Sequence, residues 1–383
     1  MTSVLYVHTR FDSPGGANYV AVETANRLVQ RDDLAISIAT ARFNHDIYDL
    51  CDDVQLYEFG GGSPSTLGHW IQLPHILHSL SSIIDTKEVD IVVFHSIPTP
   101  YWTVVLERLA PEITYAWFAH DPNAYLNLPG KIEDIPNPLR TFVQVFLPGI
   151  RHFDRHIVRK HVDTILSNSE FTKQIITDAY DVHSTVIYPG VRTDYFSGYS
   201  ETLNQSFFTV GQLNRYNNFD VLIRSMGILT DRLENPPSLI IGGEGQNREY
   251  LEDLVWQEGL TDFVTFVGYL SDQELREQYA RSLATVYLPE NEPFGLVPVE
   301  SMASGTPVVA IDSGGIRETI IDEKTGKLVS SVSEEAIANA LVEIATDTEY
   351  RESLENSAQK RARKLFSAPE MANRFEDILR RES

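Results

Sequence analysis

A strand, a turn and a helix that carry two glutamates constrain the fold more than any other stretch of the sequence. Residues 285–288 are a short β-branched run typical of a buried strand, and the turn from Pro289 to Gly295 ends it. A helix is expected to begin near Leu296, because Pro298 would then lie in its first turn, where a missing N–H is tolerated. Residues 308–315 predict the next strand and a glycine loop after it. This order predicts a parallel sheet whose strand ends present two helix N-termini and free loop amides, a site suited to an anion such as phosphate.

The two glutamates, Glu292 and Glu300, are separated by seven residues. Glu292 lies in the turn before the helix, and Glu300 lies about one turn inside it, roughly 6 Å further along the axis. We therefore expect the two carboxylates to contact different parts of one ligand, one a sugar and the other a ribose. The alternative is a helix N-terminus that carries two solvated glutamates.

This stretch resembles the Glu-x7-Glu signature of the retaining glycosyltransferases of family 4. The segments Glu-Pro-Phe-Gly, Ala-Ser-Gly-Thr-Pro-Val-Val and Gly-Gly-Ile-Arg-Glu occur in that order between residues 292 and 318. A long ordered string is far more specific than a single glycine motif. The resemblance covers nearly the whole chain and implies the GT-B fold, an α/β architecture of two Rossmann-like domains facing across a cleft.

The pattern of strands and helices restarts at Phe207, after a polar run at residues 197–206. The chain is therefore expected to hold an N-terminal, acceptor-side Rossmann-like domain (1–190), a linker (191–206), a C-terminal, nucleotide-sugar-binding Rossmann-like domain (207–366) and a terminal helix (367–383). In the family, such a helix returns to the first domain.

Three features of the first domain are candidates for ligand contacts. Gly15 and Gly16 form the loop after the first strand, without the full Gly-x-Gly-x-x-Gly of a dinucleotide site. Family 4 enzymes carry a similar loop whose amides approach donor and acceptor; the alternative is a flexible turn without a ligand. His95 and His120 each follow a predicted strand, where functional residues collect. His120 resembles the family histidine that contacts the transferred sugar, whereas His95 is expected to be structural.

The second domain departs from the family in the loop that begins at Gly211. The family sets an arginine directly after this glycine and a lysine just before the next helix, and both grip the donor diphosphate. This chain has Gln212 and Asn217 at those positions. We expect Arg215 to fold inward and take this role, since its bidentate guanidinium suits phosphate oxygens. The alternative is a weaker grip on the donor, or a nearly inactive enzyme. Gly243, in a second glycine turn, is expected to lie at the nucleotide.

The resemblance implies transfer of a hexose, of mannose or glucose type, from a nucleoside diphosphate sugar to an acceptor hydroxyl with retention at the anomeric carbon. Negative charge would build on the leaving diphosphate. The backbone amides of Phe294, Gly295 and Leu296, together with Arg215, would stabilise that charge.

Specific roles follow for three side chains under the same resemblance. Glu292 would orient sugar hydroxyls, His120 would hold the sugar, and Glu300 would bind the ribose. The sequence has no Asp-x-Asp motif, so a bridging metal is not expected, and no cofactor is expected besides the donor substrate. Two other functions stay open: a non-catalytic nucleotide-sugar-binding subunit of a glycan assembly complex, suggested by Gln212 and Asn217, and a nucleotide-sugar epimerase. An NAD-dependent dehydrogenase would need the glycine fingerprint that is missing here.

The composition limits which binding partners and which cellular compartment are expected. A formal net charge of −23 argues against nucleic acid as a partner. Only 8 of the 31 basic residues are lysines, a balance that resembles proteins of a high-salt cytoplasm; the alternative is an ordinary acidic protein. No apolar run reaches the roughly 18 residues of a spanning helix and no leader opens the chain, so a cytoplasmic protein is expected. The single cysteine, Cys51, excludes an intramolecular disulfide.

Residues 139–161 predict a basic amphipathic helix in this acidic chain. Phe153 and two aliphatic residues after it are expected on one face. Three basic residues recur every four positions on another face: Arg151, Arg155 and Arg159. Such a helix could dock on the inner face of an anionic membrane or bind an acceptor pyrophosphate; the alternative is a solvated helix face. Residues 115–187 further resemble family members that elongate lipid-linked oligosaccharides, so a lipid-linked or cell-surface glycan acceptor is expected.

Overall fold

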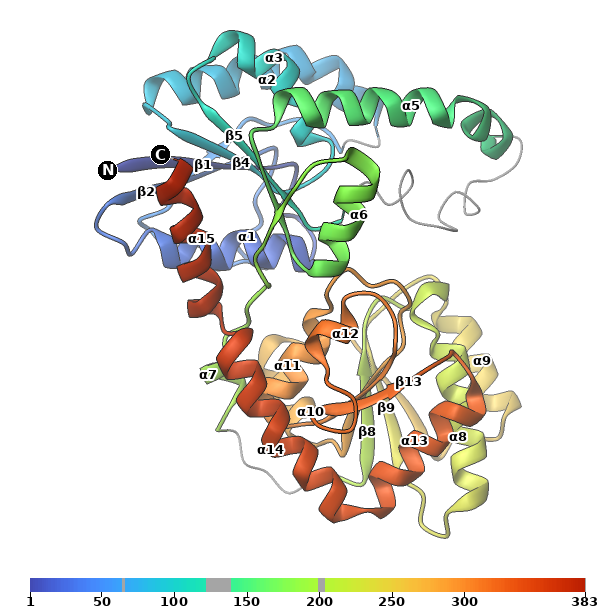
Figure 1. Ribbon diagram of the computed structural model, residues 1–383. Coiled ribbons are helices and arrows are strands. Elements are labelled where there is room, and N and C mark those ends of the chain that lie inside the picture. The colour runs from blue at the N-terminus through green and yellow to red at the C-terminus, as the bar shows by residue number, and fades with distance from the viewer. Residues whose placement is uncertain (64–65, 122–138, 199–203, 383) are drawn as a thin grey trace. The chain divides into compact units, whose positions relative to one another are not determined.

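The computed structural model of the protein describes residues 1–63, 66–121, 139–198 and 204–382. The chain forms two compact units (Figure 1): unit 1 comprises Met1–Tyr188 and Met371–Ser383, and unit 2 comprises Pro189–Glu370. The chain passes from one unit to the other between Tyr188 and Pro189. The described parts of the expected linker, residues 191–198 and 204–206, belong to unit 2, and residues 199–203 lie outside the described residues.

Unit 1 is built on a parallel sheet that has seven strands among the described residues, in the order β3-β2-β1-β4-β5-β6-β7. Its central strands are continuous apolar runs, as expected of a parallel sheet covered on both faces. The strands are β1 (Thr2–His8), β2 (Leu34–Thr40), β3 (Gln55–Glu58), β4 (Ile91–Phe94), β5 (Thr114–Ala119), β6 (Thr164–Ser167) and β7 (Thr185–Val186).

Helices cover both faces of this sheet because its side chains alternate between them. Val4 and Tyr6 pack with α1 (Gly16–Leu28) and with α15 (Ala368–Glu382), which contributes Phe375. Leu5 and Val7 face the opposite core. That second core is covered by α2 (Leu67–Thr86), η1 (Thr99–Trp102), α3 (Thr103–Leu109), α5 (Leu139–His161) and α6 (Glu170–Tyr180).

Pro74 does not interrupt the helix that contains it, although a proline inside a helix often breaks it. Helix α2 runs from Leu67 to Thr86 with Pro74 inside it. Pro74 is exposed, so water can solvate the carbonyl that loses its N–H partner, and the helix continues past the proline. None of the described helices combines the length and the apolar character needed to cross a membrane.

Unit 2 repeats the parallel architecture with a sheet that has six strands among its described residues, ordered β10-β9-β8-β11-β12-β13. The strands are β8 (Ser206–Val210), β9 (Ser238–Gly242), β10 (Val264–Gly268), β11 (Ala284–Tyr287), β12 (Val308–Ile311) and β13 (Gly326–Val329). The helices are α7 (Thr193–Phe196), η3 (Arg215–Asn217), α8 (Phe219–Arg232), α9 (Arg248–Gln257), α10 (Asp272–Arg281), α11 (Leu296–Ser304), α12 (Ile316–Thr319), α13 (Glu334–Thr346) and α14 (Thr348–Leu365).

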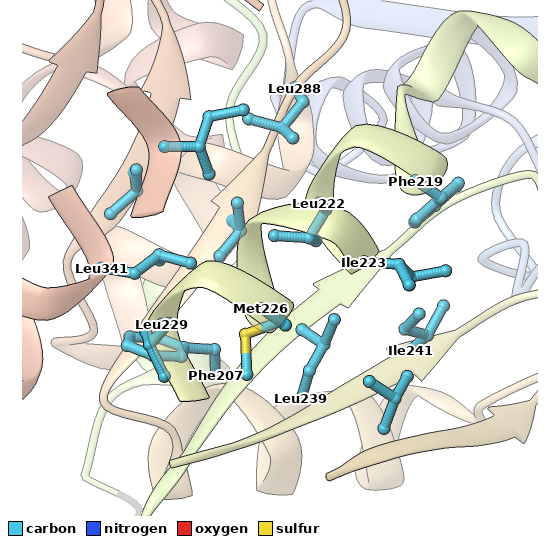
Figure 2. Close-up of a cluster of buried hydrophobic side chains, with 14 of the residues drawn as sticks. Phe207, Phe219, Leu222, Ile223, Met226, Leu229, Leu239, Ile241, Leu288 and Leu341 are labelled. Atoms are coloured by element: carbon cyan, nitrogen blue, oxygen red, sulfur yellow. The ribbon is translucent and has the colours of Figure 1, made fainter. Parts of the chain in front are cut away.

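The main core of unit 2 lies between the sheet and helix α8. Figure 2 shows Leu222 and Met226 of α8 beside Phe207 of β8 and Leu239 of β9, with Leu341 of α13 in the same cluster. These apolar contacts fix α8 against the strands. The loop between β8 and α8 is therefore held at the carboxyl edge of the sheet, where the candidate residues gather.

Candidate functional site

The predicted site residues of unit 2 lie at the point where the strand order of its sheet reverses. Strand β8 stands between β9 and β11, so the loops that leave β8 and β11 emerge side by side. Asn218, in the left-handed conformation at the start of α8, donates its Nδ2–H to the Leu288 carbonyl over 2.8 Å. This bond ties the β8 loop to the turn that carries Glu292.

Each of the two signature glutamates is held by a tyrosine. The Tyr279 hydroxyl of α10 donates to Glu300 Oε2 over 2.9 Å, and the Tyr287 hydroxyl at the end of β11 forms a hydrogen bond with Glu292. Burial, with the neighbouring glutamates adding to it, raises the pKa of both tyrosines well above the ordinary value, so both hydroxyls remain donors. Glu292 and Glu300 are only partly exposed. Their partial burial counts against the alternative of two solvated glutamates.

The Glu300 carboxyl titrates near neutrality. Burial and the nearby charge of Asp272 raise its pKa, the hydrogen bond from Tyr279 and the charge of Arg192 lower it, and the net pKa is about 7. Arg192 itself pairs with Asp272, with 2.6 Å between Nη2 and Oδ2. Glu300 is therefore only partly ionised at neutral pH, and it loses its ability to accept hydrogen bonds as a carboxylate as the pH falls.

Helix α11 presents an uncapped N-terminus beside Glu292. Its N-cap is Gly295, with φ +85°, and no side chain caps the helix. The first N–H groups of a helix have no partner within the helix, so those at Leu296 and after it are available to an anion. Phe294 is buried and packs edge-on against Phe366, which anchors the turn. Phe294, Gly295 and Leu296 thus lie together at one helix start, as the sequence predicts.

The second predicted anion site, the glycine loop after β12, has two of its amides engaged within the protein. The Ser313 N–H donates to a carbonyl of β12, and the Gly315 N–H donates to the Glu292 carbonyl over 2.8 Å. A Cβ on Gly314 would lie 2.5 Å from the Glu292 oxygen, and one on Gly315 would overlap the Pro293 carbonyl. The helix that follows, α12, has only four residues. The loop therefore supports the backbone of the Glu292 turn, and its binding of an anion stays a prediction.

Gly211 and Gly243 lie against each other at the ends of β8 and β9. A Cβ on Gly243, whose φ is +108°, would overlap the Gly211 carbonyl oxygen. The Gly211 N–H donates to the Gly242 carbonyl and the Gly243 N–H to the Gly268 carbonyl. These amides are thus engaged within the protein. The two glycines shape the loops, and their contact with a substrate stays a prediction.

The two residues that replace the family's basic pair serve the loop itself. Asn217 donates its Nδ2–H to the Gln212 carbonyl over 2.7 Å, and Asn214 donates to the Gln212 side chain. Arg215 does not fold inward: it is exposed, its guanidinium carbon lies 5.1 Å from the centroid of the Tyr216 ring, and its Nη2 lies 3.2 Å from the Tyr216 hydroxyl. The role of Arg215 toward the diphosphate is therefore still a prediction.

Three histidines meet at the strand ends of unit 1. His8 ends β1, His95 follows β4 and His120 follows β5, and these three strands are neighbours in the sheet. His95 Nδ1 lies 3.1 Å from His120 Nε2. Burial lowers the pKa of His120 to about 3 and that of His8 to about 4, and it holds the pKa of His95 well below the ordinary value. Sequence reasoning missed His8; the strand order would have indicated it.

The loop at Gly15 and Gly16 is anchored on both sides. Gly15 is the N-cap of α1, and no side chain caps that helix. The carbonyl of Ser13 accepts hydrogen bonds from the Tyr48 hydroxyl over 2.7 Å and from Asn18 Nδ2 over 3.1 Å. These bonds count against the alternative of a flexible turn, and a contact between these glycines and a ligand stays a prediction.

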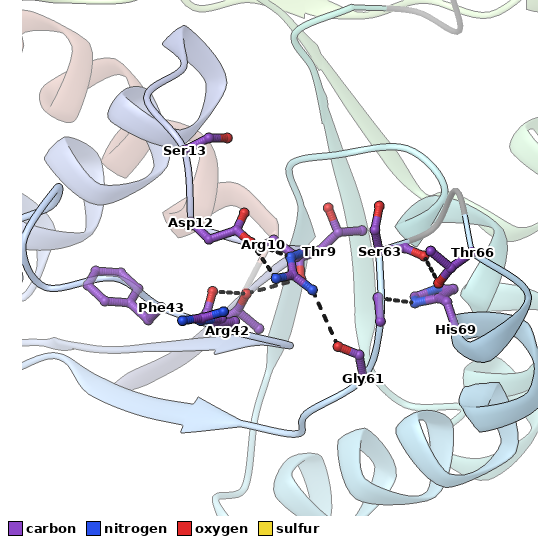
Figure 3. A network of polar contacts seen from close by, with 12 residues as sticks. Thr9, Arg10, Asp12, Ser13, Arg42, Phe43, Gly61, Ser63, Thr66 and His69 are labelled. Atoms are coloured by element: carbon purple, nitrogen blue, oxygen red, sulfur yellow. Dashed lines mark hydrogen bonds and ion pairs between the residues drawn. The ribbon is translucent and has the colours of Figure 1, made fainter. Parts of the chain in front are cut away.

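Arg10, which the sequence did not single out, organises the neighbouring loops. Figure 3 shows its guanidinium between Asp12 and Gly61: Nε donates to Asp12 Oδ2 over 2.6 Å and Nη1 to the Gly61 carbonyl over 3.4 Å. The hydrogen bond from Arg10 holds the pKa of Asp12 below its usual value. His69 holds the same glycine loop through the Gly62 carbonyl. Among the described residues, no group of histidine, cysteine, aspartate or glutamate side chains could hold a metal ion.

Helix α5 confirms the predicted helix but not the predicted faces. Arg155 donates to the Ala179 and Asp178 carbonyls at the end of α6, and Arg159 pairs with Asp181. Arg155 thus contacts the end of α6, and Arg159 contacts the residue that follows it. Phe153 is 65% exposed and belongs with other exposed apolar residues of the helix, Val145, Phe146 and Ile150.

Models of known protein families match both halves of the chain. The family model described as Glycosyltransferase Family 4 matches residues 14–195, and the one described as Glycosyl transferases group 1 matches residues 200–361. The chain belongs to glycosyltransferase family 4. The predicted family is thereby confirmed.

Two relatives illustrate the range of the similarity. An uncharacterised glycosyltransferase of Methanocaldococcus jannaschii is 35% identical over 158 residues, which are 41% of this chain and only 40% of that relative. A D-inositol 3-phosphate glycosyltransferase of Corynebacterium aurimucosum is 26% identical over 95% of this chain and 90% of its own length.

Solved structures match over the whole chain. A sucrose-phosphate synthase of Thermosynechococcus elongatus has a TM-score of 0.81 at 18% identity and covers 100% of this chain and 99% of its own. The Anabaena protein HepE, solved with UDP-glucose, has a TM-score of 0.78 at 16% identity, with both chains fully covered. At this identity the likeness concerns the fold, and it confirms the α/β GT-B class.

Proposed function

We propose that the protein transfers a hexose, of mannose or glucose type, from a nucleoside diphosphate sugar to an acceptor hydroxyl, with retention at the anomeric carbon and without a cofactor or bridging metal. The observation that carries this proposal is the pair of tyrosine-held glutamates beside the uncapped start of α11. It combines two hydrogen-bond acceptors for hydroxyl groups with an anion site, which are the needs of a sugar joined to a diphosphate.

Each part of this arrangement has a proposed role. Glu300 accepts hydrogen bonds from the ribose, and Glu292 orients the hydroxyls of the sugar. The amides from Phe294 to Leu296 and the dipole of α11 stabilise the negative charge that builds on the departing diphosphate. His120 of unit 1 contacts the sugar, and Arg215 binds diphosphate oxygens after leaving Tyr216. The names of the relatives support a nucleotide sugar as donor, since one structural neighbour was solved with UDP-glucose.

The proposed acceptor is a lipid-linked or cell-surface glycan, reached from the cytoplasmic face of a membrane. Helix α5 supports this setting: Val145 and Phe153 are 69% and 65% exposed, and the same helix carries Arg151 on its exposed surface. An exposed apolar stripe with basic residues near it is the pattern of a helix that lies in a membrane interface.

A second candidate function is a non-catalytic nucleotide-sugar-binding subunit. The bonds of Asn217 and Asn214 to Gln212 favour it, because residues committed to the loop cannot grip a diphosphate. Such a subunit would bind the donor but transfer nothing. The two functions therefore differ in turnover and share the binding site.

A thermal-shift panel of UDP-, GDP- and ADP-linked glucose and mannose, in low and high salt, tests the shared site. A ligand present at about 100 times its Kd should stabilise the binding unit by roughly 2.7 kcal/mol, enough for a clear shift in Tm. The shift should be much smaller in Glu300→Gln and kept in the exposed Glu249→Gln of α9. If no nucleotide sugar stabilises the protein, both functions are wrong. Release of nucleoside diphosphate in the presence of glycolipid acceptors then separates the enzyme from the binding subunit.

A further inference from the structure

His95 is enclosed by aromatic rings at the centre of unit 1. It is 1% exposed, and its ring lies 4.6 Å from Tyr6 and parallel to Phe375 at 6.5 Å, both between ring centroids. Its Nδ1 faces His120 Nε2 at 3.1 Å. Because the surrounding rings hold His95 in place, the orientation of His120 depends on this contact.

The contact joins two neutral rings. Burial lowers the pKa of both His95 and His120 far below neutrality, so neither ring is protonated twice near neutral pH. A single proton therefore lies between the two nitrogens. Either His120 carries it on Nε2 and donates to His95, or His95 carries it on Nδ1 and donates to His120.

The far side of His95 decides between these arrangements. Its Nε2 is buried and has no hydrogen-bond partner among the described residues. If His120 were the donor, His95 would keep its own proton on Nε2, which would be a buried N–H without an acceptor. Orphaned buried N–H groups are rarer in proteins than acceptors that lack a donor. The arrangement with a bare Nε2 on His95 is therefore favoured.

We propose that His95 is a positioning residue: it donates its Nδ1–H to His120 Nε2 and holds His120 in the tautomer that carries its proton on Nδ1. The inference rests on the proposed function in one respect, the contact between His120 and the sugar. In this tautomer His120 presents an N–H that can donate to a sugar hydroxyl oxygen. The ring stays neutral, so it orients the sugar and does not act as an acid.

His8 provides an internal reference within the same cluster. Its Nδ1 accepts a hydrogen bond from the Arg10 N–H over 3.2 Å, so His8 carries its proton on Nε2. Two neighbouring histidines are thus expected in opposite tautomers. This contrast does not depend on catalysis or on a bound ligand.

Long-range ¹H–¹⁵N correlation spectra of the full chain, labelled at its 11 histidines, test the proposal. We expect His120 to be protonated on Nδ1 and His8 on Nε2. In His95→Ala, His120 should lose its fixed tautomer, whereas His95→Asn should restore it because the asparagine Nδ2 stands near the position of Nδ1. A proton on His120 Nε2 in the wild-type protein, or an unchanged His120 in His95→Ala, overturns the proposal. If His95→Ala does not fold, the wild-type and His95→Asn spectra still decide.

Turnover provides the second readout. His95→Ala should lower kcat about fivefold to tenfold, the equivalent of one neutral hydrogen bond, with little change in KM for the donor. His95→Asn should recover most of that loss, and His78→Asn, an exposed control on α2, should behave as wild type. If no donor is turned over while the two tautomers are found as expected, the proposed function fails and the histidine arrangement stands. Equal losses in His95→Ala and His95→Asn, with wild-type Tm values, would contradict the positioning role.

Discussion

Tyr279 sets the pH range over which Glu300 can serve as a carboxylate. Burial raises the pKa of Glu300 and the Tyr279 hydrogen bond opposes that increase, which leaves the pKa at about 7. Only the ionised form accepts two ribose hydroxyls, so donor affinity should rise as the pH increases through 7. Tyr279→Phe removes the bond that favours the charge, so the midpoint should move to higher pH and affinity at pH 7 should fall about tenfold. Calorimetric titration with the donor found in the panel measures both effects.

Controls separate this effect from general damage. Glu300→Gln cannot ionise, so its weaker binding should not change with pH, and the exposed Tyr269→Phe should behave as wild type. Since the folded-state pKa of Glu300 is raised above 4.5, the stability that its neutral form contributes is full below 4.5 and is lost as the pH rises through 7. Glu300→Gln should therefore gain stability relative to wild type as the pH rises. A wild-type affinity that does not vary around pH 7 would contradict this reading of Glu300.

At the residue scale, the sequence indicated the glutamates but not what holds them. Glu292 and Glu300 lie in one local pattern, so their spacing alone predicts a site. Tyr279 reaches Glu300 across 21 positions in the chain, through the packing of α10 on α11. No local periodicity encodes such a contact. His8 escaped notice for a similar reason, because its neighbours are set by the order β1-β4-β5.

At the scale of elements, the loop after β12 is expected to act as a support for the Glu292 turn. Gly314→Ala would place a Cβ 2.5 Å from the Glu292 carbonyl oxygen at a φ of +60°. We expect a loss of at least about 2 kcal/mol in the free energy of unfolding, from the left-handed backbone and the overlap together. Turnover should fall further than stability explains, because the turn that carries Glu292 must move. Chemical denaturation and donor turnover measure the two effects.

Gly227→Ala is the matched control for this substitution. Gly227 lies within α8, and nothing stands within 4 Å of a Cβ placed there. Alanine should stabilise the helix by about 0.5–1 kcal/mol and leave turnover unchanged. If Gly314→Ala were as stable and active as Gly227→Ala, the supporting role of the loop would be wrong.

Helix α5 makes a separate prediction about membranes. Val145→Ser with Phe153→Ser removes two exposed apolar side chains, each worth about 1.5–3 kcal/mol when fully buried, so binding to anionic vesicles should fall by at least tenfold. Arg151→Ala should lose roughly 1 kcal/mol of the same affinity. Arg155→Ala should instead lower Tm, since it contacts the end of α6. Vesicle sedimentation measures binding, with Trp256→Ser of unit 2 as the control.

Unchanged vesicle binding in the double variant would show that the exposed face of α5 is a solvated helix face and not a membrane-binding one. Sequence periodicity predicted the helix and its amphipathic character correctly. It could not predict what each face contacts, because a basic side chain on a helix can be solvated by water, bind lipid headgroups or donate to a neighbouring carbonyl. The position of α6 decided the role of Arg155, and that position follows from the packing of the sheet.

At the scale of the whole molecule, the alternation of strands and helices sufficed for the α/β class and for two parallel sheets. A buried strand is recognisable in the sequence as a short apolar run. A glycine turn follows the carboxyl end of such a strand, as at Gly211 and Gly243. The point at which the chain changes units was harder, since Val191 pairs with Ser367 across a bridge within unit 2. The polar composition of this stretch predicted a linker, but part of the stretch pairs with other residues of unit 2 and so belongs to that unit.

The net charge of −23 yields the last prediction, which concerns stability in salt. With 54 acidic and 31 basic residues, many carboxylates have no opposite charge to meet, and their repulsion weakens the compact state. Salt screens this repulsion over a distance that shrinks from about 10 Å at 0.1 M to about 3 Å at 1 M, so Tm should rise with KCl. The many surface ion pairs oppose the trend only weakly, because exposed pairs contribute at most about 1 kcal/mol each. Calorimetry in increasing KCl, against sorbitol at matched osmolality, isolates screening from solute exclusion. A Tm that falls with KCl, or rises equally in sorbitol, would mean that the acidic surface is ordinary and not an adaptation to salt.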